Sequence, residues 1–119
     1  MRVWDLPVDM LCTRHLQGEH NEIHTMWNVI TLGRKGWAKH PETMRWRGRL
    51  GALKARHDAV VTELQRRGRF NHKTALDLHF VEVDGPETWI QDRLIESVDS
   101  QIANIRAKGC KCHLAGGQP

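Results

Sequence analysis

Residues 15–31 read HLQGEHNEIHTMWNVIT, and this stretch decides how the rest of the chain folds. Its apolar side chains recur close to the 3.6-residue period of an α-helix: Leu16, Ile23, Met26, Trp27 and Ile30. The pattern predicts one amphipathic helix that begins near residue 7 or 9 and continues to about residue 31. Gly33 follows as a stop signal.

A second apolar stripe predicts a second long helix. Its positions also follow the helical period: Leu50, Leu53, His57, Val60, Val61 and Leu64. Pro41 suits the first turn of a helix, so it is the expected start of this element. Gly68 is the expected end, and the cations Arg66 and Arg67 favour the last turn because they complement the helix dipole.

The last part of the chain contains one ambiguous segment and one clear helix pattern. In residues 69–85, Leu76, Leu78 and Phe80 alternate, which fits a short strand or an extended loop packed on the core. Residues 84–87 read DGPE, a typical helix start, and an apolar stripe then continues to Gly109: Ile90, Leu94, Val98, Ile102 and Ile105. We therefore predict an all-α fold, a single compact domain over residues 1–119 with three main helices, long connecting loops and a flexible tail at 110–119.

The charge distribution indicates one strongly basic surface. The 119 residues carry a formal charge of +4, but residues 34–73 hold twelve Lys and Arg against three acids, Glu42, Asp58 and Glu63. Such a concentration is typical of a phosphate-binding surface, and a solvated helix face is the alternative. Trp37 and Trp46 within this stretch favour nucleic acid as the partner.

Three further features bear on the compartment. No apolar run approaches the roughly 20 residues that span a bilayer, and residues 1–5 do not resemble a signal peptide. The three cysteines, Cys12, Cys110 and Cys112, are too few and odd in number for a disulfide framework. We expect no membrane partner and a cytoplasmic protein.

The first predicted helix carries a group of residues that can perform acid–base chemistry. Glu19 and Glu22 are three apart and share a face, and His15 is four before Glu19. By composition alone, these residues are typical of a charged helix surface.

Together with the chain start, this group resembles the pyrimidine-dimer DNA glycosylases (endonuclease V) of bacteriophage and bacteria. The helix has the form His15-Leu16-x-x-Glu19-x-x-Glu22-Ile23, and Arg2 matches the Arg that follows the family's nucleophilic first residue. The second helix matches as well, at Trp46, Leu50, Leu53, Arg56 and in Glu63-x-x-x-Arg67-Gly68. The resemblance covers roughly residues 1–31 and 46–70.

The resemblance implies an enzyme that excises damaged bases and cleaves the strand at the abasic site. In this family the terminal α-amine forms an imine with the sugar, and a carboxylate assists. It implies Met1 and Glu22 as the catalytic pair, with Met1 retained because Arg2 is too large for removal of the initiator residue. No cofactor is expected. The implied substrate is damaged or abasic double-stranded DNA, most of all pyrimidine dimers, bound by a monomer at the nucleoid of a bacterial or phage-infected cell.

The resemblance and the charge pattern also nominate residues that contact DNA. The set is Arg2, Arg14, His15, Asn21, Arg45, Arg47, Arg49, Lys54, Arg56 and Arg93, with Glu19 in a supporting role. Asn21 and Thr25 stand where the phage enzymes have basic residues, and residues 109–113 replace an aromatic-rich end. The lesion that is recognised is therefore open. A non-catalytic DNA-binding protein of the same fold is the alternative function.

Metal ligation is the remaining alternative. His20 and His24 are four apart on one helix, a spacing that can bind a metal, and Cys110-x-Cys112-His113 together with Cys12 offers soft ligands. Cys-x-Cys-His is not a usual structural zinc spacing. The sequence therefore favours no metal site, and a metal-dependent regulator is the third hypothesis.

Overall fold

The computed structural model describes residues 2–68, 70, 72, 75–81, 86–110 and 112. Its elements are η1 (Val8–Met10), α1 (Thr13–Leu32), α2 (Pro41–Trp46), α3 (Leu50–Arg67), η2 (Leu78–Phe80), η3 (Pro86–Trp89) and α4 (Val98–Ala107), where η marks a 3₁₀ turn. The described residues contain no strand, so the predicted all-α fold with three main helices is confirmed. None of the helices in this part of the chain is both long and apolar enough to cross a lipid bilayer.

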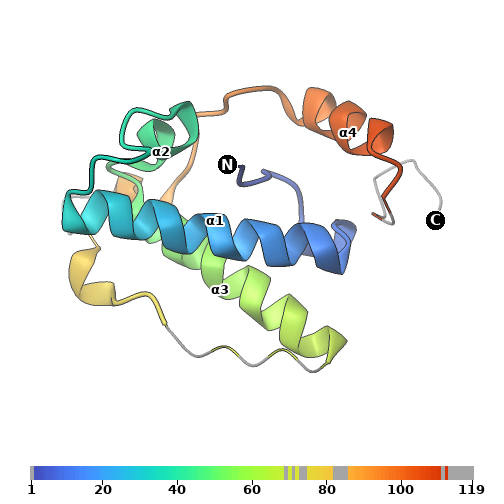
Figure 1. The fold of residues 1–119 in the computed structure, drawn as a ribbon, viewed down its shortest axis with the longest axis horizontal. Helices are drawn as coiled ribbons and strands as arrows, with labels where there is room; N and C mark the ends of the chain where they lie inside the picture. Colours follow the sequence, from blue (N-terminus) through green and yellow to red (C-terminus); the bar gives the residue numbers. More distant parts are fainter. Residues whose placement is uncertain are drawn as a thin grey trace.

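Helices α1 and α3 form the centre of the molecule, where they cross and pack against each other (Figure 1). Their apolar stripes meet at Ile23, Met26 and Leu53, each fully shielded from solvent. Gly33 ends α1 in the left-handed conformation, at φ 66°, and its N–H donates to the carbonyl oxygen of Val29. The predicted stop signal is therefore confirmed, because glycine adopts this conformation without steric cost.

The N-terminal segment lies inside the fold, between α1 and α4 (Figure 1). Val3, Trp4 and Leu6 are 1%, 6% and 1% exposed, so this extended stretch belongs to the core. Asp5 holds α4 in place, because its N–H donates to Gln101 Oε1 at 2.8 Å and its Oδ2 accepts from Gln101 Nε2 at 3.0 Å. Residues 3–6 are thereby held in the middle of the molecule.

The first helix begins later than the sequence suggests. The expected start near residue 7 or 9 was wrong, because residues 8–10 form the separate turn η1 and Cys12 is extended at ψ 160°. Helix α1 begins at Thr13. The irregular lead-in allows Leu6 and Leu11, which are 1% and 0% exposed, both to reach the core. In one continuous helix, positions 6 and 11 would not lie on the same face, so the two side chains could not both point into the core.

The second predicted helix is divided in two. Pro41 does open a helix, as expected, but α2 ends at Trp46 and α3 begins at Leu50. Between them the backbone of Arg47 is extended and Gly48 has φ 75°. Gly68 follows the last residue of α3, in agreement with the predicted end.

The third main helix is shorter than predicted. It begins at Val98 instead of near residue 87, and Ser97 caps it by accepting from the N–H of Ser100 at 3.1 Å. Upstream, Gln91 Nε2 donates to the carbonyl oxygen of Arg45 at 2.8 Å, and Arg45 Nη1 donates to that of Arg93 at 2.9 Å. These long-range bonds hold residues 90–93 against α2 in place of a helical ladder.

The segment around residue 80 is neither a strand nor fully extended. Residues 78–80 form the turn η2, and Phe80 is 41% exposed. Leu76 is 4% exposed and packs on the core formed by α1 and α3, so only part of the alternating pattern reflects burial.

Gly51 is placed where no larger residue fits. A Cβ added there would lie 2.5–2.8 Å from three ring atoms of Trp89, whereas a Cβ at Gly18 would meet nothing within 4 Å. Both glycines are inside helices, so the helix propensity gained on replacement by Ala is similar and cancels in a comparison. We expect Gly51→Ala to be less stable than Gly18→Ala by about 1–3 kcal/mol. Urea denaturation measures the difference, and equal midpoints would show that Trp89 moves aside at no cost.

Candidate active site

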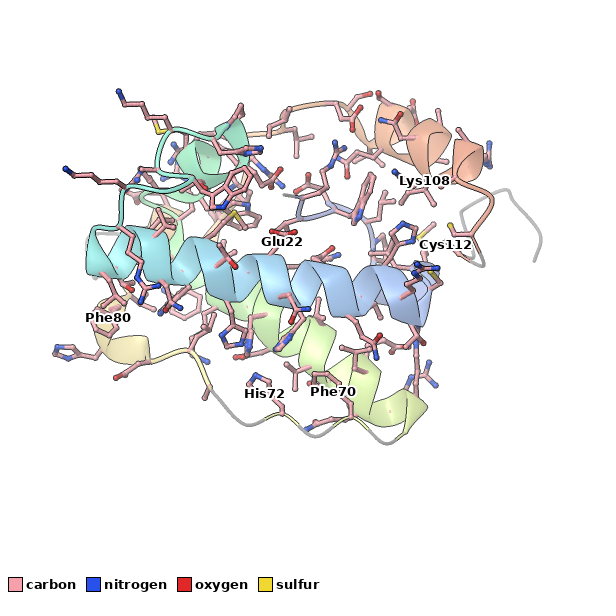
Figure 2. All side chains as sticks on the ribbon, in the orientation of Figure 1. Glu22, Phe70, His72, Phe80, Lys108 and Cys112 are labelled. Atoms are coloured by element: carbon pink, nitrogen blue, oxygen red, sulfur yellow. The ribbon has the colours of Figure 1, made fainter. Side chains whose placement is uncertain are left out.

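Glu22 lies on the side of α1 that faces the N-terminal segment (Figure 2). It lines a cleft of about 350 Å³, a size that suits a small ligand or one nucleotide. The helical period places His15, Glu19 and Glu22 along one stripe of α1, as the sequence predicts. The residues lining the cleft are Arg2, Trp4, Cys12, Arg14, His15, Gly18, Glu19, Glu22, Lys108 and Cys110.

Glu19 anchors the N-terminal segment beneath this cleft. Its Oε1 accepts the backbone N–H of Trp4 at 3.0 Å, and its Oε2 accepts Arg56 Nε at 2.5 Å. Arg56 in turn donates from Nη1 to the carbonyl oxygen of Leu6 at 2.6 Å. One ion pair therefore ties α1, α3 and the chain start together. The partner of Glu19 is Arg56, and Arg2 lies elsewhere in the cleft wall.

The carboxylate of Glu19 is shielded from solvent. Burial raises the pKa of Glu19, and the Arg56 guanidinium together with the Trp4 N–H opposes that rise. A buried carboxylate with its oxygens committed to a guanidinium and a backbone amide positions other groups. Glu22 is only half-buried and is the carboxylate that lines the cleft on its open side.

The cleft is lined by cations. Arg14 and Lys108 are exposed at its edge, and Arg2 is half-buried with its guanidinium 4.3 Å from the centre of the Trp4 ring. Arg2 also forms an ion pair with Glu96. Burial, followed by the nearby charges of Lys108 and Arg14, lowers the pKa of His15. Cations can bind phosphate, and a carboxylate beside them can move protons in the same place.

A second cleft continues the same surface. It measures about 820 Å³ and shares Cys12, Arg14, Lys108 and Cys110 with the first. Arg66 and Arg67 line its far side, where both bind Glu63, at 2.5 Å and 2.8 Å. The positive surface therefore extends from Glu22 past the start of α1 to the end of α3.

Two arginines of the predicted DNA-contact set are engaged inside the fold. Arg45 is 6% exposed, and its guanidinium donates to Glu42 at 2.7 Å, to Asp5 at 3.0 Å and to the carbonyl oxygen of Val3 at 2.8 Å. Arg56 is held by Glu19 as described above. All three guanidinium nitrogens of Arg45 form hydrogen bonds within the protein. Arg45, through Val3 and Asp5, and Arg56, through Leu6, therefore hold the N-terminal segment in place.

The remaining predicted residues fall into two places. Asn21 is exposed next to Glu22 on α1. Arg47, Arg49 and Arg93 gather around α2, where Arg93 Nη2 donates to the carbonyl oxygen of Arg47 at 2.8 Å. Arg49 faces Asp92 at 3.6 Å, and Lys54 pairs with Asp58 at 2.7 Å on α3. Met1 lies outside the described residues, and the neighbouring Arg2 lines the cleft with Glu22.

Lys108 and Cys110 are cleft residues that the sequence reasoning did not include. They follow α4, and Lys108 lies close to the start of α1 (Figure 2). No local motif could have found them, because they are more than eighty positions from Glu22 in the chain.

The side chains able to hold a metal form two groups among the described residues. One group contains Cys12, His15, Cys110 and Cys112, at the edge of the cleft. The other consists of four histidines, none of which lines that cleft. His113, which the sequence pattern paired with the cysteines, lies outside the described residues.

Comparison with known proteins supports the resemblance noted in the sequence. The pyrimidine dimer DNA glycosylase family matches residues 1–78, which include α1, α3 and the carboxylate-bearing side of the cleft. Searches of curated proteins and of solved structures give no match. Since the family match covers about two thirds of the sequence, the chain belongs to the pyrimidine dimer DNA glycosylase family of DNA-repair enzymes.

Proposed function

We propose that this chain excises a damaged base and then cleaves the DNA strand by β-elimination, with its terminal α-amine as nucleophile and Glu22 as the acid–base group. The observation that carries the proposal is the cleft that joins Arg2, one residue from the chain start, to Glu22 and to cations. The family match supports the substrate class, damaged duplex DNA with pyrimidine dimers foremost. The protein needs no cofactor for this chemistry and acts as a monomer.

An α-amine suits nucleophilic attack near neutral pH. Its ordinary pKa is about 7.7–8.0, against about 10.4 for a lysine side chain. At pH 7 roughly a tenth of the α-amine is neutral, whereas well under a thousandth of a lysine amine is. Cations such as Arg14 and Lys108 near the cleft favour the neutral amine further.

The reaction proceeds in three steps. The amine lone pair forms a bond to C1′ as the C1′–base bond breaks, and the base leaves with the bonding electrons and takes up a proton. The amine then loses a proton while the C1′–O4′ bond opens, which leaves an iminium and a protonated O4′. Removal of the C2′ proton finally expels the 3′ phosphate and cuts the strand. Glu22 stabilises the positive charge on the sugar and carries these protons.

DNA binding uses the positive surface around the cleft. Arg14 and Lys108 contact phosphates beside the reacting sugar, and Asn21 and His15 lie within the same stretch of α1. Arg47, Arg49 and Arg93 contact the backbone farther along the duplex. A base inside the helix is out of reach, so the target nucleotide rotates out of the stack to enter the cleft.

Trapping of the imine tests this mechanism. Borohydride added to the protein and a duplex with an abasic site should reduce the imine to a stable adduct. Mass spectrometry of the digested adduct should place it on the first residue, because the α-amine is the neutral amine at neutral pH. Acetylation of the terminus should abolish trapping.

The control is Lys108→Ala, since Lys108 is the lysine that lines the cleft. This variant should trap like the parent protein apart from weaker DNA binding. An adduct on Lys108 in the parent protein would contradict the assignment of the α-amine as the nucleophile. Salt-sensitive duplex binding with no adduct and no cleavage would favour the alternative, a non-catalytic DNA-binding protein of this fold.

A further inference from the structure

Four histidines from three parts of the chain meet at one point. His20 and His24 come from α1, His57 from α3, and His72 from the segment that follows α3. The Nε2 atom of His24 lies 3.2 Å from that of His20, 3.0 Å from that of His57 and 3.4 Å from that of His72. The Nε2 atoms of His57 and His72 are 3.1 Å apart. The same ring nitrogen of each histidine therefore faces a common centre.

Hydrogen bonding among the rings does not account for this arrangement. A ring nitrogen of neutral imidazole either carries one hydrogen or offers one lone pair, so it forms one such bond. His24 Nε2 has three other Nε2 atoms within 3.4 Å. A cation at the centre would accept one lone pair from each ring and satisfy all four together.

The spacing fits tetrahedral zinc. Zn–N bonds of about 2.0–2.1 Å place the ligand atoms of a tetrahedron about 3.3–3.4 Å apart. The four Nε2 separations given above lie between 3.0 and 3.4 Å.

His57 has the outer partner that a metal ligand usually needs. The residue is 1% exposed, and its other ring nitrogen, Nδ1, lies 2.9 Å from Asp58 Oδ1. A carboxylate in this place keeps the hydrogen on Nδ1 and leaves the Nε2 lone pair facing the centre. Lys54 holds the other oxygen of Asp58 at 2.7 Å.

We propose that His20, His24, His57 and His72 bind one Zn²⁺ ion. Four protein ligands fill a tetrahedral shell, so the ion is structural: it joins α1 to α3 and to His72. His72 and Phe70 lie on the opposite side of α1 from Glu22 (Figure 2). The ion is therefore separate from the chemistry in the cleft. The sequence paired only His20 with His24 and favoured no metal site. The structure adds His57 and His72 to this pair.

A second group of ligands supports a second zinc site on independent evidence. Cys12 Sγ and Cys112 Sγ each lie 3.2 Å from His15 Nδ1, and the N–H of Cys12 donates to Cys112 Sγ at 3.0 Å. Cys110 completes the set, whose ligand atoms all lie within 4.8 Å of one another. Three thiolates and one histidine are a regular structural zinc set.

We infer that this Cys₃His group also binds Zn²⁺. The ion would fasten the residues after α4 to the start of α1, as the position of Cys112 in Figure 2 suggests. It would thereby hold Lys108 and Cys110 in the wall of the cleft. A spacing of one residue between Cys110 and Cys112 is unusual within a zinc motif, and the remaining ligands come from nearly a hundred residues earlier.

Metal analysis of single variants tests each site separately. The full chain, exchanged into buffer with Zn²⁺ and then desalted, should hold two zinc ions per molecule by elemental analysis. His72→Ala should retain one, and Cys112→Ser should retain one. His79→Ala is the matched control, because His79 is exposed and outside both groups, and it should retain two. A site is overturned if its variant holds as much zinc as the control.

Cobalt substitution keeps the test valid even if a variant folds poorly. Co²⁺ bound to the chain should show thiolate charge-transfer absorption that Cys112→Ser removes and His72→Ala preserves. Asp58→Asn should weaken zinc binding at the histidine site by about 10–100-fold, since Asp58 orients His57. The matched control is Asp99→Asn, the same chemical change at an exposed position on α4 outside both groups, which should leave zinc binding at the histidine site unchanged. An intact mass lower by two hydrogens would show a disulfide and overturn the cysteine site. Co²⁺ spectra without any thiolate band would overturn it as well.

Discussion

Replacing Glu22 with Gln should lower the rate of strand cleavage at an abasic site by about 10²–10⁴-fold, the usual contribution of a positioned acid–base group. The amide keeps the size of the side chain but can neither accept a proton nor stabilise a sugar cation. Because Glu22 is half-buried at a cleft wall, the free energy of unfolding should change by less than about 0.5 kcal/mol. Single-turnover cleavage of an abasic duplex and urea denaturation measure the two quantities.

The matched control is Glu87→Gln, the same chemical change at an exposed position on η3. It should cleave at the parental rate. A loss smaller than tenfold in Glu22→Gln, with the fold intact, would remove Glu22 from the mechanism. Duplex binding measured at several salt concentrations separates lost chemistry from lost affinity.

Replacing Glu19 with Ala should destabilise the protein by about 3–5 kcal/mol, because a mostly buried Arg56 would be left without its carboxylate. The N–H of Trp4 would lose its acceptor at the same time. Glu22→Ala, one turn further along α1, is the comparison and should cost far less. Denaturant midpoints at constant m-value report the difference.

The double variant Glu19→Ala/Arg56→Ala separates the ion pair from simple loss of packing. The two changes should be non-additive by about 0.5–3 kcal/mol, because the second substitution removes the uncompensated charge left by the first. Strictly additive losses would show that the pair is not coupled. Imine trapping should also fall in Glu19→Ala, since Glu19 positions the N-terminal segment through the N–H of Trp4.

Much of the helical architecture follows from local patterns. The apolar stripe from Leu16 to Ile30 determines which face of α1 packs on the core. Gly33 ends α1, and Pro41 begins α2. These signals act over a few residues, through side-chain periodicity and the conformational range of glycine and proline. The stripe that carries His15, Glu19 and Glu22 could be predicted for the same reason.

Where long-range hydrogen bonds compete with local preference, the local sequence pattern does not predict the structure. The apolar stripe from Ile90 onward fits a helix, yet Arg45 takes the carbonyl oxygen of Arg93 and Gln91 takes that of Arg45. Likewise, the local charge density around Arg45 and Arg56 suggested DNA contacts. In the folded chain both guanidinium groups hold the N-terminal segment, since burying a charge demands internal partners.

The sequence by itself determined the helical class, the family and the shared stripe of α1 that carries Glu19 and Glu22, because each is encoded in local residue patterns. Tertiary structure alone decided that Lys108 borders the cleft of Glu22 and that His57 and His72 meet His20 and His24. Residues on different elements come together only when helices pack. No periodicity within one helix records which side chains of another helix will face it.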